Sequence, residues 1–440
     1  MCELERWRPL RATASLVFAE VRTTCRRSHR VATKANGGKL RIVAAKTCMK
    51  ILSIETSCDE TAVSVMEADG DLRQSNYRVP GNALYSQAAL HNAYGGVYPN
   101  LAKREHQKNL VPLTIRALTE AHLFQRATTT VNCSSGVEKN VRDEQFRRDI
   151  QEFLETTQKP DIDLIAVTNG PGLEPALWAG ISFARALDIA WNIPAVGINH
   201  MEGHIVSAFL QKDRDKSKYQ MANIKFPLLA LLISGGHTEL VLMKEWFQYE
   251  LIGKTRDDAV GEAFDKVARI LGMPYPGGPE IDRATSRART RTSDVLVSLP
   301  RPMLRDDSCD FSFSGLKTAV LYLVRDMKEL SETDKENIAR EFENAVSEVL
   351  VAKTARALEK THAKTLVVGG GVSANTHIRE GLESLIRHSF PDVALRYPEQ
   401  NLTGDNAIMI GVAAYLRYAA HRTTPNDTLE AVGSLSLAES

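Results

Sequence analysis

The sequence predicts an α/β protein built from two duplicated lobes. Strand-like and helix-like segments alternate along its 440 residues, which is typical of buried central sheets covered by helices. Two distant segments, 50–66 and 227–243, also share one plan in which an apolar strand runs through a polar turn into a second strand. A chain that opens two halves with the same unit indicates duplication.

The individual elements follow from hydrophobic periodicity and from turn residues. The first hairpin places strands at 51–54 and 62–66 around a turn at 55–61. Before the second hairpin we expect, in order, a helix over 103–123, a strand over 163–169, a helix over 175–191 and a strand over 195–199. The second hairpin, with strands at 228–233 and 239–243, is followed by helices over 259–271 and 337–361, a strand over 365–371, and helices over 375–389 and 405–420.

These elements divide the chain into four parts. We expect a tail over 1–48, an N-terminal lobe over 49–222, a C-terminal lobe over 223–420 and a flexible tail over 421–440. The polar, aperiodic stretch at about 126–149 reads as a surface insertion in the first lobe. The second lobe is expected to carry a helical insertion, and its last helix to return to the cleft between the lobes.

The first 46 residues differ in composition from the rest. They hold 11 lysines and arginines against three acidic residues, with serine, threonine and alanine between them. This composition predicts a mitochondrial transit peptide and a matrix location, with a disordered tail or a misassigned start as the alternatives. Because the whole chain has a formal charge of +1, the remainder is net negative, so any nucleic-acid binding must use a local basic patch.

The remaining composition excludes other classes of protein. The six cysteines are scattered, without the spacing of a zinc site or the density of a secreted disulfide framework, and this favours a reducing compartment. No run of about 18 apolar residues occurs, so the sequence predicts no membrane span.

Three turns concentrate glycine and hydroxyl residues. Thr56, Ser57 and Thr61 lie in the first hairpin turn, the second reads Ser-Gly-Gly-His-Thr at 234–238, and "GGGVSAN" at 369–375 joins a strand to a helix. Such turns can aim N–H and hydroxyl donors at a phosphate, although each alone is also an ordinary tight turn. None is a GxGxxG or Walker motif. Their recurrence in both lobes predicts a nucleotide in the cleft.

The stretch 261–283 adds carboxylates. Glu262, Asp265 and Lys266 open an apolar helix, and two glycines of a "YPGGP" turn precede Glu280 and Asp282. Acidic residues facing a cleft can bind ribose hydroxyls, whereas acids at a helix start can simply stabilise the helix dipole.

"INHMEGH" at 198–204 carries the metal chemistry. A spacing of four residues puts His200 and His204 on one helical face, where they can chelate one cation or serve a structural role. Glu202 fits neither the HExxH nor the HxxEH order of metalloproteases and points off the shared face. Asp405 at the start of the last helix is the candidate third ligand, and two imidazoles with one carboxylate suit iron or zinc.

Ten motifs, taken together, resemble the tRNA N6-adenosine threonylcarbamoyltransferase family, once labelled O-sialoglycoprotein endopeptidases. They occur in the family's order from about residue 50 to 418 and read "IETSCDET", "YGGVYPNLAKREH", "NGPGL", "NHMEGH", "LISGGHTEL", "DDAVGEAFDKVARILG", "YPGGP", "DFSFSGLKTA", "GGGVSAN" and "TGDNAIMIG". The basic tail and the insertion at 126–149 depart from the commoner pattern, and the tail makes the chain similar to mitochondrial members.

The resemblance implies an actin/Hsp70/sugar-kinase-like fold with the active site between the lobes. It implies transfer of a threonylcarbamoyl group from L-threonylcarbamoyl-adenylate, made by a separate synthase, to N6 of adenosine 37 in the anticodon stem-loop of tRNAs reading ANN codons, with release of AMP. It further implies a homodimer and one divalent metal ion, iron or zinc, per subunit.

The resemblance also assigns roles to residues. His200, His204 and Asp405 would hold the metal. Asp59 and Glu60 match acidic residues near the reacting group, and Asp59 is our candidate for the base. The expected substrate-binding residues are Leu232, Ile233, Ser234, Gly235, Gly236, Asp265, Gly278, Asp282 and Asn375. Basic residues of the first long helix, Lys103, Arg104 and Lys108, either meet tRNA phosphates or form a solvated face.

Three rival functions use parts of the same pattern. A glycoprotein metallopeptidase lacks the required glutamate spacing and leaves the glycine turns without a role. An ATP-driven switch or kinase of this fold would explain the turns but not the histidines with Asp405. A non-catalytic tRNA scaffold is hard to reconcile with a net negative chain.

Overall fold

The computed structural model describes residues 32–33, 41–42, 48–127, 141–213, 217–291, 297–327, 329–423 and 429–439. The chain divides into two units, 1–49 and 50–440. In the first unit, β1 (Ala32–Thr33) pairs antiparallel with β2 (Arg41–Ile42). The rest of the predicted transit segment, and residues 128–140 of the predicted insertion, lie outside the described residues.

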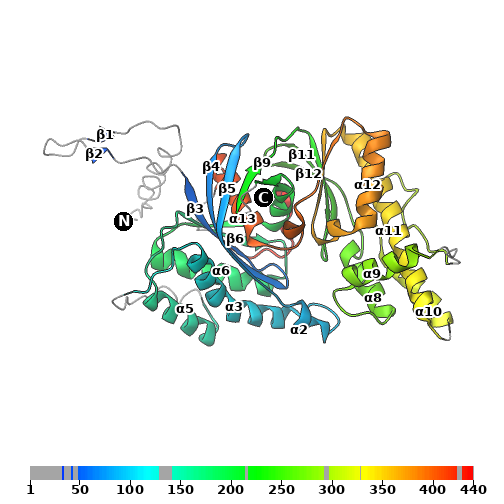
Figure 1. Cartoon of the computed structure of the whole chain (residues 1–440), viewed down its shortest axis with the longest axis horizontal. Helices are drawn as coiled ribbons and strands as arrows, with labels where there is room; N and C mark the ends of the chain where they lie inside the picture. Colours follow the sequence, from blue (N-terminus) through cyan, green and yellow to red (C-terminus); the bar gives the residue numbers. More distant parts are fainter. Residues whose placement is uncertain are drawn as a thin grey trace, which may run out of the picture. The chain divides into compact units, whose positions relative to one another are not determined.

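The N-terminal lobe is built on a seven-stranded sheet with the order β7-β6-β3-β4-β5-β9-β8 (Figure 1). The antiparallel pair β4–β5 continues the first predicted hairpin, and β6 runs parallel to both β3 and β7. The strands are β3 (Met49–Glu55), β4 (Glu60–Gly70), β5 (Ser75–Ser86), β6 (Leu164–Gly170), β7 (Ala195–Asn199), β8 (Leu210–Lys212) and β9 (Lys218–Met221).

The C-terminal lobe has a five-stranded sheet with the order β12-β11-β10-β13-β14. Its strands are β10 (Leu228–Ile233), β11 (Thr238–Glu245), β12 (Gln248–Lys254), β13 (Thr365–Gly369) and β14 (Ala394–Arg396). In each lobe the first three strands form an antiparallel meander, and two later strands add in parallel beside the first strand. This shared order, third-second-first-fourth-fifth, confirms the predicted duplication.

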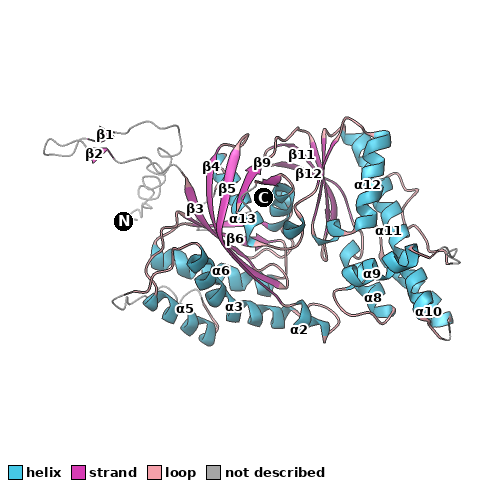
Figure 2. Cartoon of the chain, viewed as in Figure 1, coloured by secondary structure: helices cyan, strands magenta, loops and turns pink. Residues whose placement is uncertain are grey.

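Helices cover both faces of each sheet (Figure 2). On the N-terminal sheet α3 and α6 contact one face and α13 the other, while α11 and α7 contact the C-terminal sheet. The helices of the first lobe are α2 (Ala88–Asn92), α3 (Pro99–Glu120), α5 (Glu144–Thr156), α6 (Glu174–Trp191) and α7 (His200–Ser207). Those that follow are α8 (Val260–Ile270), α9 (Gly277–Arg289), α10 (Ser314–Asp326), α11 (Glu332–Thr361), α12 (Thr376–Ser389) and α13 (Ala407–Ala419), with 3-10 turns η1 (Gly371–Ala374), η2 (Gln400–Leu402) and η4 (Leu437–Glu439).

Burial on both faces explains why the central strands read as continuous apolar runs. Every residue of β10 is inaccessible to solvent, and Leu229, Leu231 and Ile233 belong to the core of the second lobe. Leu52 and Ile54 of β3 belong to the separate core of the first lobe. Within the described residues, no helix has the length and apolar character needed to cross a membrane.

The structure corrects three boundaries. Residues from Val141 onward, within the predicted surface insertion, belong to the first lobe: α5 begins at Glu144, the side chain of Asp143 caps it by accepting from Phe146 N at 3.0 Å, and Phe146 is buried. The sequence did not predict this helix because only Phe146 of its buried apolar face lies within 126–149; Ile150, Phe153 and Leu154 complete that face beyond the boundary. Helix α13 follows the second lobe in sequence but packs on β4 and α7 of the first.

The third correction concerns the predicted flexible tail. Residues 429–435 pack on the first lobe, where Leu429 is 3% exposed and joins its core, whereas η4 contacts β12 of the second lobe. Val432 N donates to Asn169 O at 2.9 Å, and Gly433 O accepts from Gly172 N at 3.0 Å. Small and polar residues dominate this stretch, so its anchoring through backbone hydrogen bonds left little trace in the hydrophobic pattern.

Candidate active site

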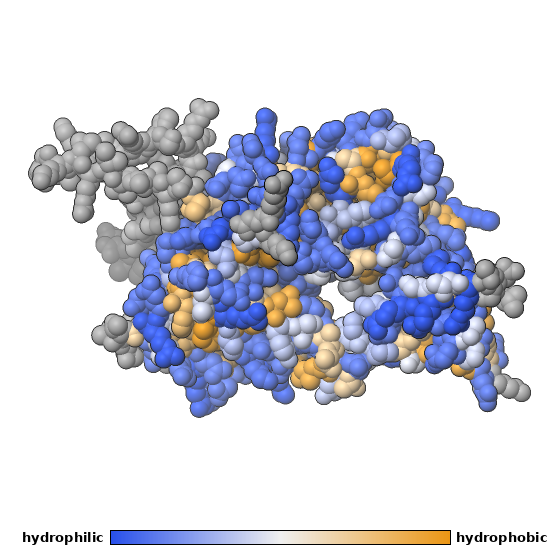
Figure 3. Space-filling view, in the orientation of Figure 1, coloured by the Kyte–Doolittle hydropathy of each residue, from blue (hydrophilic) through white to orange (hydrophobic). Residues whose placement is uncertain are grey.

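A cleft of about 970 Å³ lies between the two lobes. Figure 3 shows the molecule hollowed between them. The first lobe contributes the turn after β3 and the start of α7, and the second contributes the turn after β10 and the starts of α8, α9 and η1. All three predicted glycine turns therefore open into one space.

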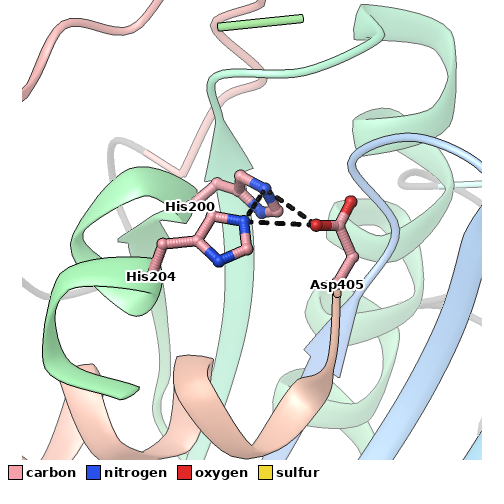
Figure 4. A group of neighbouring side chains, drawn as sticks. All are labelled: His200, His204 and Asp405. Carbon is pink, nitrogen blue, oxygen red and sulfur yellow. Dashed lines mark hydrogen bonds and ion pairs between the residues drawn. The ribbon is translucent and has the colours of Figure 1, made fainter. Parts of the chain in front are cut away.

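His200, His204 and Asp405 meet at the floor of this cleft (Figure 4). The Nε2 atoms of the two histidines are 3.1 Å apart, and Oδ1 of Asp405 lies 3.3 Å and 3.2 Å from them. Donors bound at about 2.0 Å in tetrahedral geometry are about 3.3 Å from one another, so the three atoms outline one face of such a site. The donor set fits one divalent ion with positions left open toward the cleft.

Local sequence explains how the two histidines converge. Asn199 ends β7 and caps α7, because its side-chain oxygen accepts from Met201 N at 2.9 Å. The helix therefore starts at His200 and brings His204 onto the same face one turn later, with the two rings perpendicular at 87°. Asp405 comes from the loop before α13, whose cap is the adjacent Asn406.

A buried carboxylate that the sequence analysis did not select holds the ring of His200. Oε2 of Glu55 lies 3.1 Å from Nδ1 of His200, opposite the nitrogen that faces Asp405. Glu55 also accepts from Ser57 N and Thr168 Oγ1, each at 2.5 Å. Metal-bound histidines typically donate their second N–H to such a carboxylate, so this contact supports the metal interpretation.

The electrostatics favour the metal-binding charge states of Asp405 and His204 but not that of His200. Burial lowers the pKa of His200, but the carboxylates of Asp405 and Glu55 outweigh it and raise this pKa well above its usual range, so metal binding displaces a proton from the ring. Burial opposes ionisation of Asp405, but the two histidines outweigh it and hold the pKa of Asp405 well below its usual range. Burial lowers the pKa of His204, and its Nδ1 is buried without a partner among the described atoms. A deprotonated aspartate and a neutral imidazole are the forms that bind metal.

Glu202 is turned away from the cleft, as its position on the helix predicts. Its carboxylate is fully buried and forms a bidentate ion pair with Arg417 of α13, with N–O distances of 2.8 and 2.6 Å. A carboxylate committed in this way on the opposite side of α7 cannot activate water at the ligand group.

Asp59 and Glu60 line the cleft beside the ligand group. Burial and then the charge of Asp59 raise the pKa of Glu60 to about 9, so Glu60 carries a proton at neutral pH. Asp59 Oδ2 accepts from the hydroxyl of Tyr275 at 3.4 Å across the cleft. The pair therefore offers one proton donor and one proton acceptor.

The glycine turns divide into residues that reach the cleft and residues that support it. Ser234, Gly235 and Gly236 line the space, and a Cβ added to either glycine would meet nothing within 4 Å. Leu232 and Ile233 do not line it, because both are buried in β10. The prediction that these two bind substrate is wrong for their side chains, which only position the turn.

A third glycine turn approaches the same point from β13. Gly370 has φ of +89°, and a Cβ there would lie 2.4 Å from Ile233 O. Only glycine fits so close to the neighbouring strand, and this contact lets the two turns lie side by side.

The predicted ribose site is assembled on α8 and α9. Asp265, Gly278 and Asp282 all line the cleft. Asp265 accepts from Gly277 N at 2.7 Å, and burial raises its pKa to about 6. Asn375 also lines the space, but its side chain caps α12 through Ile378 N at 3.0 Å and donates to Glu343 at 2.7 Å. Its polar atoms are therefore already engaged.

Several lining residues escaped the sequence analysis. Tyr275 and Gly433 reach the cleft from a loop and from the C-terminal segment. His237 lies within the second predicted turn, and burial followed by the neighbouring His200 lowers its pKa to about 4. A histidine directly after a glycine pair in a nucleotide-type turn was the one available signal.

Comparison with known proteins shows to which family the chain belongs. A profile of the family described as tRNA N6-adenosine threonylcarbamoyltransferase matches residues 78–136 and 144–412. The chain belongs to this family. Curated relatives of that name are 40% identical in Latilactobacillus sakei, covering 88% of this chain and 96% of the relative, and 40% identical in an Acidovorax strain, covering 86% and 93%. The chain is thus an acyltransferase of this family, with the two-lobed fold described above.

A solved structure similar to this chain is an ROK family glucokinase from Streptomyces griseus. It is 10% identical, with a TM-score of 0.39 over 84% of this chain and 99% of the glucokinase.

Proposed function

We propose that the chain transfers the threonylcarbamoyl group from L-threonylcarbamoyl-adenylate to N6 of adenosine 37, just 3′ of the anticodon, in tRNAs that read ANN codons. AMP is the second product. The carrying observation is that the ligand group His200, His204 and Asp405 opens into the same cleft as the glycine turns and the Asp59–Glu60 pair. That juxtaposition suits an activated acyl-nucleotide and an incoming nucleophile.

The donor would bind with its adenosine over α8 and α9. Asp265 and Asp282 can accept hydrogen bonds from ribose hydroxyls. The backbone N–H groups around Gly235 and Gly236 then face the phosphate, where the absence of side chains permits close approach. One iron or zinc ion on His200, His204 and Asp405 would, when bound, stabilise negative charge on the oxygens of the donor.

In the transfer step N6 of the adenine attacks the carbamoyl carbon. The new N–C bond forms, the bond from that carbon to the phosphate oxygen breaks, and AMP leaves with the electron pair. The proton from N6 passes to Asp59, since Glu60 beside it already holds one. Bound substrates that fill the cleft would also limit access of water, which would hydrolyse the donor.

The cellular setting belongs to the same proposal. The basic, hydroxyl-rich composition of the first 46 residues supports import into the mitochondrial matrix. There the chain would act as a homodimer and receive the adenylate from a separate synthase.

A reconstituted reaction tests the activity. Purified protein is incubated with threonine, bicarbonate, ATP, a verified adenylate synthase and unmodified tRNA, and the nucleosides are analysed by mass spectrometry. We expect the threonylcarbamoyl nucleoside only when protein and synthase are both present. Absence of product with folded protein and an active synthase would refute the proposal.

A further inference from the structure

Two tyrosines stand exposed at the mouth of the cleft. Tyr94 is 62% and Tyr98 57% exposed, which are the highest values among the exposed large hydrophobic side chains of the described residues. Their ring centroids are 6.2 Å apart and their planes differ by only 26°. Large aromatic rings normally bury their area, so a near-parallel exposed pair indicates a surface that meets a partner.

The backbone beneath the two rings is fixed. His91, which is fully buried, accepts from Tyr94 N through its carbonyl at 2.9 Å and from Tyr98 N through Nδ1 at 3.4 Å. Its other ring nitrogen contacts Gln87 Oε1 at 3.1 Å. The turn that carries the tyrosines is therefore held by hydrogen bonds. Because its backbone is already ordered, a ligand that contacts the rings costs little conformational entropy.

The turn between the two tyrosines is part of the cleft. Gly95, Gly96 and Val97 line it. A Cβ built on Gly95 would lie 3.5 Å from Cδ of Arg269, which reaches over from α8 of the other lobe. The preceding Asn92 accepts from Tyr275 N at 2.9 Å, also across the cleft. A ligand that enters the cleft past this turn must pass the two rings.

We propose that Tyr94 and Tyr98 form a stacking platform for an unpaired base of the RNA substrate, next to the adenosine that enters the cleft. The inference rests on the proposed function. Every base offers a π face to an aromatic ring, and loops are where RNA presents unstacked bases. Arg269 beside the platform is exposed and forms no ion pair within the described part of the chain, so it is available to a phosphate.

Substitution of the rings tests the platform. We expect Tyr94→Ala and Tyr98→Ala to raise KM for the tRNA about 5- to 100-fold and to leave KM for the adenylate unchanged. Tyr94→Phe and Tyr98→Phe keep the stacking face and should stay within about threefold of wild type. Tyr322→Ala is the matched control, because Tyr322 is 52% exposed on α10 and does not line the cleft.

A direct readout of stacking does not depend on turnover. An anticodon stem-loop with the fluorescent base 2-aminopurine 3′ of the target adenosine should lose fluorescence on binding wild type and much less on binding the double alanine variant. Equal quenching by both proteins, or an unchanged KM for tRNA, would overturn the platform. If the alanine variants have half the molecular mass of wild type in solution, the two tyrosines form an interface between two copies of the chain, and the stacking platform is overturned. Failure of wild type to form product would instead refute the proposed function.

Discussion

Oε2 of Glu55 lies 3.1 Å from Nδ1 of His200, the ring nitrogen opposite the one that faces Asp405. This contact fixes the orientation of the ring. It directs the Nδ1 proton at Glu55, so the lone pair of Nε2 is free to point at the metal position. Both residues are buried, and Glu55 accepts two further hydrogen bonds at 2.5 Å. Glu55 is therefore a positioning residue for the metal ligand.

Glu55→Gln should lower metal affinity about 10- to 100-fold while the fold is retained. The amide keeps the shape of the side chain but loses the charge that favours the correct tautomer of His200. Titration of the metal-free protein against a chelator of known affinity measures the effect. Glu105→Gln on α3, outside the ligand group, is the control, and equal affinities of Glu55→Gln and wild type would contradict the positioning role.

Asp405→Asn should remove bound metal and turnover together. The substitution is nearly isosteric and Asp405 precedes rather than belongs to α13, so the melting temperature is expected to change little. Metal content is measured by elemental mass spectrometry of the purified protein, with His200→Ala as the parallel variant. A full equivalent of metal in both variants would refute the ligand assignment.

Breaking the ion pair between Glu202 and Arg417 should lower the stability of the protein but not its turnover. Arg417→Met leaves a fully buried carboxylate without its partner, which costs about 3–5 kcal/mol of unfolding free energy. Denaturant unfolding measures this loss, and Glu202→Gln combined with Arg417→Met should recover part of it. The double variant should keep its turnover per folded molecule. If Glu202 were catalytic, replacing it would abolish turnover.

The strands and helices that were predicted from sequence are those with strong local signals. The strand at 195–199 agrees with β7, and the helix at 175–191 begins one residue early as α6, because each couples a clear apolar period to turn residues at its ends. β5 was missed because Pro80 and Gly81 interrupt it; a Cβ on Gly81 would lie 2.0 Å from Ala117 O of α3. Such a close approach is decided by tertiary packing.

In the candidate site, too, the residues set by local sequence were predicted and those set by tertiary contacts were not. The four-residue spacing located His200 and His204, because helical geometry alone brings them together. Glu55 and Tyr275 could not be found in this way, since each acts through a residue more than 100 positions away, His200 and Asp59 respectively. Leu232 and Ile233 were assigned to the substrate because their motif continues into the glycine turn, although their side chains point into the core.

His106 should give the first lobe a pH-dependent stability. This fully buried ring contacts Cys58 O at 2.9 Å and Thr61 Oγ1 at 2.8 Å, on either side of Asp59 and Glu60. Burial lowers its pKa to about 4, below the usual 6.5. The unfolded chain therefore takes up the proton first, and stability present above pH 6.5 is lost as the pH falls toward 4.

The expected slope from this one group is at most about 1.4 kcal/mol per pH unit. Urea unfolding of wild type and His106→Gln between pH 4 and 8 measures it, and the variant should show a shallower loss on acidification. Equal slopes in the two proteins would contradict a neutral, buried His106. His388→Gln on the exposed end of α12 provides the control for a histidine change without burial.

The C-terminal segment should contribute to stability through Leu429. Its side chain is 3% exposed within the core of the first lobe, and its carbonyl accepts a hydrogen bond from Arg185 of α6. Leu429→Ala is therefore expected to lower the unfolding free energy by about 2–5 kcal/mol, as for other buried leucines. Val432→Ala three residues later removes a side chain that is 39% exposed and should change stability by less than about 0.5 kcal/mol. Chemical denaturation separates the two outcomes, and equal unfolding free energies of the two variants would mean that the segment is not docked in solution.

Because Gly433 of this segment lines the cleft, Leu429→Ala should also raise KM for the adenylate, whereas Val432→Ala should not.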